Sequence, residues 1–237
     1  MKPFLTAEWR NLLNLTYAVD PALLQSYLPP GLQCALYRGQ AHVSFIAFDF
    51  LETRLKGIKV PFHVNFPEVN LRFYVQRGKA IGVVFVRELV PRYWIAQVAR
   101  TLYNEPYRAV PMRTNHLIDS DSVHINHQFR VRGHWFNVSA ASENQPYLPA
   151  SDSVEHYLKE HEIGFGQTHG GRTLYYHVEH PAWRVYPNVS PQLDVDFGWV
   201  YGPQWAFLNE RQPDYTLLAE GSPVTVFMPV LLEKSGL

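Results

Sequence analysis

A strict alternation of apolar and polar residues over positions 68–75 is the clearest pattern in the chain. One face of this extended segment is apolar, with Val69, Leu71, Phe73 and Val75. The other face is polar, with Glu68, Asn70, Arg72 and Tyr74. After a turn at 76–79 the chain returns through a segment rich in Val, Ile and Phe at 80–88, so the two segments are predicted to pair as an antiparallel hairpin.

Further segments carry the β-branched and aromatic residues typical of strands, with Gly or Pro nearby. They span 42–50, 122–131, 135–141, 173–178, 193–200 and 223–229. Short helices are predicted at 22–28, behind an Asp20–Pro21 start, from Arg92 to Asn104, and at 153–161. The pattern predicts a mainly β protein (β with minor α), an antiparallel sheet system with about three short helices at its edges. We expect one domain, 1–237.

Composition agrees with a folded domain and limits its partners. Apolar residues make up 46% of the 237 residues, and 21 basic residues balance 21 acidic ones, which excludes a mostly unfolded chain. A balanced charge lacks the basic surface that non-specific nucleic-acid binding needs, so no nucleic-acid partner is expected. Cys34 is the only cysteine, and we find no segment of signal or membrane-spanning character. We therefore expect a cytoplasmic protein without a membrane partner.

The sequence carries no recognisable nucleotide or metal motif. Neither a glycine-rich nucleotide loop nor a Gly-x-Ser-x-Gly elbow occurs. His124 and His127 have the spacing of a ligand pair, as do His177 and His180, but residues three apart on a strand face opposite ways. We therefore predict no metal site and no cofactor, and interpret these histidines as surface or hydrogen-bonded groups.

The polar face of segment 68–75 has two interpretations. It is either the solvent face of an antiparallel strand or the lining of a cavity inside a partly closed barrel. In the second case a carboxylate, an amide, a guanidinium and a phenol converge on one small ligand, and Arg72 is suited to bind a carboxylate. In segment 164–187, His180 and Trp183 either belong to the aromatic core or stand at the mouth of a pocket.

Four groups of residues resemble, in order and spacing, the uncharacterised YqjF-like family (domain of unknown function 2071). They are Trp9 with Asn14-Leu15-Thr16-Tyr17, Asp20-Pro21 and Leu28-Pro29-Pro30-Gly31-Leu32; Glu68 to Val75 with Gly82-Val83; Glu105-Pro106-Tyr107-Arg108-Ala109; and Gly164-Phe165-Gly166 with Tyr176, Val178, Glu179-His180-Pro181 and Trp183. The resemblance implies a remote relation to the acetoacetate decarboxylase fold, an antiparallel β-barrel or sandwich with a central cavity. It thereby favours the cavity interpretation of the polar face.

The same resemblance implies a changed catalytic group. In the decarboxylases a lysine forms a Schiff base with the keto acid, activated by a cationic neighbour. Aligned on the shared proline, Tyr107 takes the position of that lysine and Arg108 the position of its neighbour. A phenol cannot form an imine, and no lysine is predicted inside the cavity, so we expect no decarboxylase activity. Glu68 takes the position of a strand glutamate that assists catalysis, and can act as a base.

These observations leave three functions open. The first is an enzyme that uses acid–base chemistry on a small anionic or keto/enol compound, with Glu68 as base and Tyr107 in the lysine position. The residues expected to bind the ligand are Asn70, Arg72, Tyr74, Arg108, His180 and Trp183. The second is a non-catalytic protein that binds the same ligand, and the third is a protein-interaction domain. Assembly into a homo-oligomer is compatible with each of them.

Overall fold

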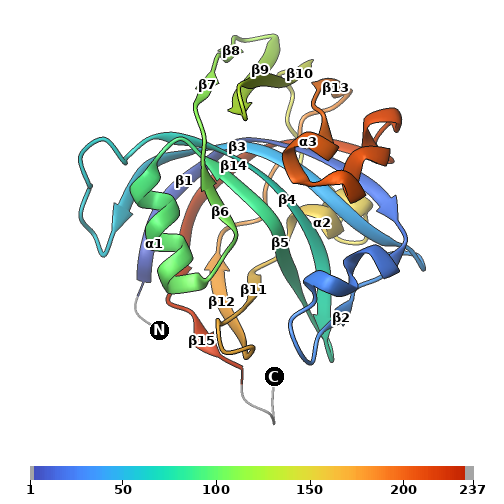
Figure 1. The fold of residues 1–237 in the computed structure, drawn as a ribbon. Coiled ribbons are helices and arrows are strands. Elements are labelled where there is room, and N and C mark those ends of the chain that lie inside the picture. The colour runs from blue at the N-terminus through green and yellow to red at the C-terminus, as the bar shows by residue number, and fades with distance from the viewer. Residues whose placement is uncertain (1–2, 233–237) are drawn as a thin grey trace.

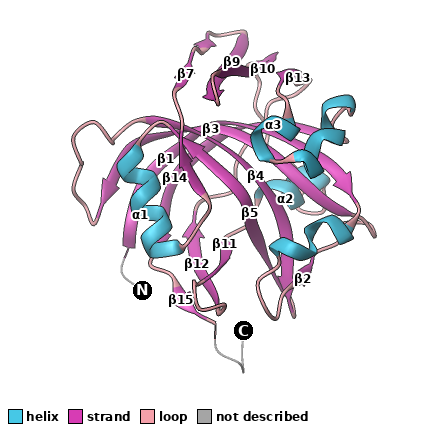
Figure 2. Ribbon diagram, in the orientation of Figure 1, coloured by secondary structure: helices cyan, strands magenta, loops and turns pink. Residues whose placement is uncertain are grey.

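The computed structural model describes residues 3–232 and confirms the mainly β fold (Figures 1 and 2). The longer strands are β1 (Pro3–Val19), β3 (Ala41–Leu55), β4 (Phe66–Arg77), β5 (Ala80–Val90), β9 (Ser122–Val131), β10 (His134–Glu143), β12 (Thr173–Glu179) and β14 (Tyr215–Phe227). The shorter strands are β2 (Gln33–Cys34), β6 (Tyr107–Ala109), β7 (Met112–Thr114), β8 (Leu117–Ile118), β11 (Ile163–Gln167), β13 (Ser190–Asp194) and β15 (Val230–Leu231). The helices are η1 (Pro21–Tyr27), α1 (Tyr93–Tyr103), α2 (Val154–Lys159), α3 (Phe197–Tyr201) and η2 (Pro203–Glu210), the two η elements being 3₁₀ helices.

The large sheet closes on itself. β4 pairs with β3 on one side and with β5 on the other, and from β3 the hydrogen-bonded order continues through β1, β14, β12 and β11 back to β5. The pairs are antiparallel, as predicted, except that β5 runs parallel to both β11 and β6. A closed ring of this kind has an interior that only side chains or a ligand can fill.

A second sheet, with the order β13-β10-β9-β7 and β8 beside β9, lies above the ring in Figure 1. Successive side chains of β3 point to opposite faces of the ring wall. Phe45 points outward and packs against Phe129 of the second sheet, with ring centroids 6.4 Å apart, whereas Ile46 and Phe48 point into the ring. One strand therefore serves two apolar clusters, which is why it is buried almost throughout.

The predicted secondary structure is wrong at 193–200 and incomplete elsewhere, since β1 and two of the helices were not expected. Segment 193–200 was expected to be a strand, but β13 ends at Asp194 and α3 begins at Phe197. The carboxylate of Asp196 accepts the backbone N–H of Trp199 at 2.9 Å, so an N-cap starts a helix inside the segment predicted as a strand. The helices also include α3 and η2, beyond the three predicted. No helix within residues 3–232 is long and apolar enough to cross a membrane.

Irregularities in β1 and β5 determine which side chains enter the ring. At Asn11 the backbone has φ 58°, and the register between β1 and β3 shifts between Arg10 and Leu13. Trp9 and Leu12, three residues apart, consequently both face the interior. β5 shifts against β4 in the same way, between the partners of Leu71 and Arg72.

The bulge of β1 depends on Gly221, which lies opposite Arg10 in β14 with φ 78°. A Cβ atom at this position would overlap the carbonyl oxygen of Trp9. We expect Gly221→Ala to lower the free energy of unfolding by about 3 kcal/mol or more, because strain and a backbone clash add. In Gly133→Ala the φ of 90° is similar but the space is open, so a loss of only about 1 kcal/mol is expected. Urea denaturation compares the two variants, and equal losses would contradict this explanation.

Candidate functional site

The ring encloses a cavity of about 330 Å³, within the range typical of small-ligand pockets. Most of its wall is apolar and aromatic, including Trp9, Phe48, Phe50, Phe66 and Phe85. The cavity reaches the surface between α1 and the segment 56–65. Trp94 of α1, which is 68% exposed, and Val60 of that segment both line it. These two elements lie next to each other in Figure 1.

The cavity also contains three glutamates that are almost completely shielded from water. Glu68 comes from β4, Glu88 from β5 and Glu105 from the turn between α1 and β6, with exposures of 2%, 1% and 7%. Buried carboxylates are rare unless they are paired with a cation, and each of these three groups has a raised pKa. The cavity is therefore able to hold protons at neutral pH.

Glu68 is the carboxyl with the most complete set of hydrogen-bond donors. The amide of Asn70 donates to its Oε1 at 2.9 Å, and the hydroxyl of Tyr107 donates to its Oε2 at 3.0 Å. Burial raises the pKa of Glu68 to about 7, while these two hydrogen bonds and the charge of Arg72 partly oppose the rise. Glu68 consequently exchanges its proton near neutral pH, as a general acid or base requires.

Glu88 and Glu105 form an acidic pair beside it. Burial raises the pKa of Glu105 to about 8, and it raises the pKa of Glu88 well above its ordinary value, with the charges of Glu105 and Glu68 adding to the effect. The two carboxyls also interact through a hydrogen bond, which requires a proton on at least one of them. Glu88 Oε2 has no hydrogen-bond partner.

Two tyrosines complete the polar part of the cavity. Tyr107 lies opposite Glu88 in the β5–β6 pairing, which explains how a residue far along the chain reaches Glu68. Tyr176 of β12 donates its hydroxyl to Glu105 Oε1. Burial and the neighbouring carboxyls raise the pKa of both phenols well above the usual value. The two phenols therefore act as neutral hydrogen-bond donors.

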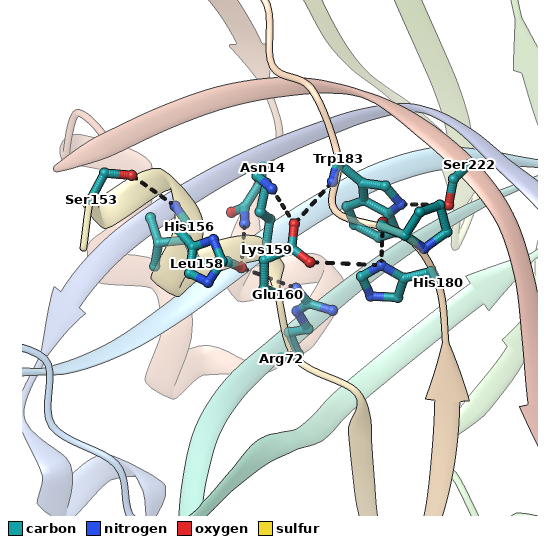
Figure 3. Close-up of polar contacts among 11 residues, drawn as sticks. Asn14, Arg72, Ser153, His156, Leu158, Lys159, Glu160, His180, Trp183 and Ser222 are labelled. Carbon is teal, nitrogen blue, oxygen red and sulfur yellow. Dashed lines mark hydrogen bonds and ion pairs between the residues drawn. The ribbon is translucent and has the colours of Figure 1, made fainter. Parts of the chain in front are cut away.

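The predicted polar face of β4 divides where α2 packs against it. Glu68, Asn70 and Arg72 line the cavity, but Tyr74 does not. The carbonyl oxygen of Leu158 in α2 accepts Tyr74 Oη at 3.3 Å and Arg72 Nη2 at 3.4 Å, and Figure 3 shows Arg72 reaching this carbonyl. Arg72 keeps a buried Nε–H, and Asn70 a buried Oδ1, that have no hydrogen-bond partner. These two atoms remain available for a ligand.

The other predicted ligand-binding residues lie in different surroundings. Trp183 lines the cavity, donates its indole N–H to Ser222 Oγ at 2.7 Å and is stacked on His180, 4.2 Å away. Both side chains are buried, so neither stands at the mouth of the pocket, and only Trp183 forms part of its wall. His180 does not line the cavity and lies 3.8 Å from Glu160 (Figure 3). Arg108 is exposed and does not line it either, because it alternates with Tyr107 along β6.

No lysine among residues 3–232 lines the cavity, and Lys2 and Lys234 lie outside the described residues. Lys159 at the end of α2 is nevertheless buried, which the sequence did not indicate. It forms an ion pair with Glu160, which also accepts the backbone N–H of Trp183 (Figure 3). Its ammonium group is therefore paired outside the cavity.

Sequence reasoning missed two of the three carboxyls. Glu88 was hidden because the irregularity in β5 breaks the alternation, so that Phe85 and Glu88, three residues apart, both face inward. Glu105 is part of the motif Glu105-Pro106-Tyr107-Arg108, in which the family resemblance assigns roles to Tyr107 and Arg108 alone. Its position next to Pro106 and after an apolar helix is the sequence feature that could have indicated a buried carboxyl.

The closed ring and its cavity define an acetoacetate decarboxylase-like fold. An acetoacetate decarboxylase from Legionella pneumophila subsp. pneumophila str. Philadelphia 1 matches with a TM-score of 0.65 and 12% identity, over 98% of this chain and 88% of that chain. The enduracididine biosynthesis enzyme MppR, solved in complex with pyruvate, matches with a TM-score of 0.68 and 13% identity, over 98% and 92%. Identities this low show a shared fold and do not transfer a reaction.

The chain belongs to the DUF2071 family, described as an uncharacterized conserved protein, whose model matches residues 6–223. The uncharacterized protein YqjF of Bacillus subtilis (strain 168) is 24% identical over 190 residues, which cover 79% of this chain and 77% of that protein. The family and the fold expected from the sequence are both confirmed.

The raised pKa values predict how stability depends on pH. Between about pH 5 and pH 8 the folded protein retains protons that an unfolded chain has lost, so each such carboxyl lowers stability as pH rises, by up to about 1.4 kcal/mol per pH unit. Glu105→Gln, which removes a carboxyl with a pKa of about 8, should flatten the decline measured by urea denaturation from pH 5 to 8. Glu179→Gln removes an exposed carboxyl as the control. An unchanged slope in Glu105→Gln would contradict the prediction.

Proposed function

We propose that this protein is an enzyme that moves a proton next to the carbonyl group of a small oxo compound, with Glu68 as the base. The observation that carries this proposal is the position of Glu68 in the cavity, with its pKa raised to about 7 and both carboxyl oxygens held by Asn70 and Tyr107. A base whose pKa is near the working pH combines an ionised fraction with a useful driving force for proton abstraction.

Removing a proton beside a carbonyl places negative charge on the carbonyl oxygen, and this charge needs hydrogen-bond donors. Tyr107 can turn its hydroxyl to that oxygen once Glu68 has taken up the proton, and a proton on the unpartnered Oε2 of Glu88 provides a second donor. The raised pKa values of both groups keep their protons on them. Glu88 Oε2 has no partner within the protein. A ligand oxygen at this position would satisfy it.

The buried polar atoms that have no hydrogen-bond partner also indicate which kind of ligand the cavity can bind. Arg72 offers a buried Nε–H to an anionic group, and Asn70 Oδ1 offers an acceptor. The remaining wall is apolar, which favours an oxo acid with a hydrocarbon or aromatic body over a strongly polar sugar or nucleotide. The fold neighbour MppR, solved with pyruvate, supports a small oxo acid as the ligand class. The cytoplasmic location and the oligomeric state remain predictions.

Schiff-base catalysis does not fit the side chains present. The family resemblance predicts Tyr107 at the position of the catalytic lysine, and no lysine of residues 3–232 lines the cavity. The chemistry proposed here therefore uses proton transfer by carboxyl groups in place of a covalent imine.

The first experiment measures proton exchange. In D₂O, with pyruvate, 2-oxobutyrate and acetoacetate as probes, wild-type protein should exchange the protons next to the carbonyl faster than buffer does, as seen by proton NMR. Glu68→Gln should lower this rate at least about 100-fold, because removal of a general base costs about 10² to 10⁴. Glu179→Gln, which changes an exposed glutamate of β12 that does not line the cavity, is the matched control. Binding of a probe without faster exchange would instead indicate a non-catalytic binding protein, and equal rates in Glu68→Gln would refute Glu68 as the base.

The second experiment tests for an imine. Borohydride reduces a Schiff base between a lysine and an oxo acid to a stable adduct that mass spectrometry detects. With acetoacetate or pyruvate, wild-type protein should show no such adduct. An adduct that disappears in Lys159→Met would contradict the proposal, since Lys159 is the lysine buried within the described residues.

A further inference from the structure

On the outer face of the ring wall, away from the cavity, we propose a binding site for a divalent transition-metal ion formed by Asp49, His116 and His127. Asp49 lies in β3, His116 precedes β8 and His127 lies in β9. One potential ligand atom from each residue lies within 4.8 Å of the others. Two histidines and one carboxylate form a ligand set that favours ions such as Zn²⁺ over Mg²⁺ or Ca²⁺.

His127 is the reason to expect a ligand here. Its side chain is completely buried, yet neither Nδ1 nor Nε2 has a hydrogen-bond partner. Buried polar groups in native proteins are nearly always paired, and an ion or water is one common partner. The ring of His127 lies 4.9 Å from that of His116, centroid to centroid, so its nitrogens are close to the other two donors. The neutral imidazole is the form of histidine that ligates metals.

The other two residues are already held in position. Asp49 Oδ2 accepts the amide of Asn11 at 3.0 Å and lies 2.9 Å from Nε2 of His116. His116 Nδ1 accepts the backbone N–H of Asn126 at 3.1 Å, so in the metal-free protein its proton is on Nε2 and is donated to Asp49. For Nε2 to bind an ion, this proton must move to Nδ1 and the hydrogen bond from Asn126 must break, because the neutral ring carries one proton.

The location indicates what the ion would do. β3 belongs to the closed ring and β9 to the second sheet, so an ion held by Asp49 and His127 connects the two sheets. His116 is partly exposed, with 16% of its side chain accessible, and gives the ion a path from solvent. A ligand set that exists only in the folded chain stabilises that chain by mass action.

The experiment uses the full chain, stripped with a chelator and titrated with Zn²⁺ alone. Calorimetry should show one Zn²⁺ per chain, and the melting temperature should rise with Zn²⁺ concentration. Asp49→Asn and His116→Ala should each weaken binding at least tenfold. His124→Ala, an exposed histidine on the same strand as His127, should bind as the wild type does. Co²⁺ in place of Zn²⁺ should give visible absorption bands that are absent in His116→Ala.

Three results would overturn the proposal. They are no saturable Zn²⁺ binding to the wild type, equal binding by wild type and His116→Ala, and loss of binding in His124→Ala alone. If His127→Asn fails to fold, as judged by circular dichroism, Asp49→Asn and His116→Ala still decide the question, because both residues lie nearer the surface than His127.

Discussion

Three carboxyl groups line one cavity and are shielded from solvent there. The unfavourable free energy of ionising them explains the other polar features of the site. Glu68, Glu88 and Glu105 come from separate elements and are all buried. Placing three negative charges in one buried cavity is unfavourable even beside Arg72, whose charge only partly opposes the rise in the pKa of Glu68, so the cavity retains protons. The neutral phenols of Tyr107 and Tyr176 fit this arrangement, since each donates to a carboxyl.

The closed ring of strands provides the burial that this chemistry needs. Its wall must face an apolar cavity on the inside and the second sheet on the outside, and β3 does both through simple alternation. At two places in the wall a β-bulge changes the direction in which the side chains point. The bulge at Asn11 turns Trp9 and Leu12 inward, and the one in β5 does so for Phe85 and Glu88. The same bulge brings Asn11 to Asp49 on the outer face.

Local patterns in the sequence predicted the hairpin of β4 and β5 and placed Glu68, Asn70 and Arg72 on one face of β4, whereas only the family resemblance favoured a cavity lining for that face. The hairpin and the shared face depend on period-two alternation, which the chain preserves there. The same reasoning could not find β1, because a strand buried on both sides and interrupted at Asn11 has no alternation to detect. It also could not separate Tyr74 from the cavity, since the element that does so, α2, is about 80 residues away.

Groups that meet only through tertiary structure were beyond the sequence. Asp49 and His127 are far apart in the chain and become neighbours because two sheets pack together, whereas the side chains of His124 and His127 diverge, one exposed and one buried. Glu105 illustrates the same limit, because nothing in its turn reveals that it faces Glu88 and Tyr176.

The retention of protons by the cavity carboxyls can be measured directly. With ¹³C-labelled glutamate side chains, carbon NMR follows the titration of each carboxyl in the folded protein. We expect one resonance to titrate near pH 7, in accordance with the raised pKa of Glu68, and to be missing from the Glu68→Gln spectrum. Titration of every glutamate near its ordinary value of about 4.3 would contradict the account.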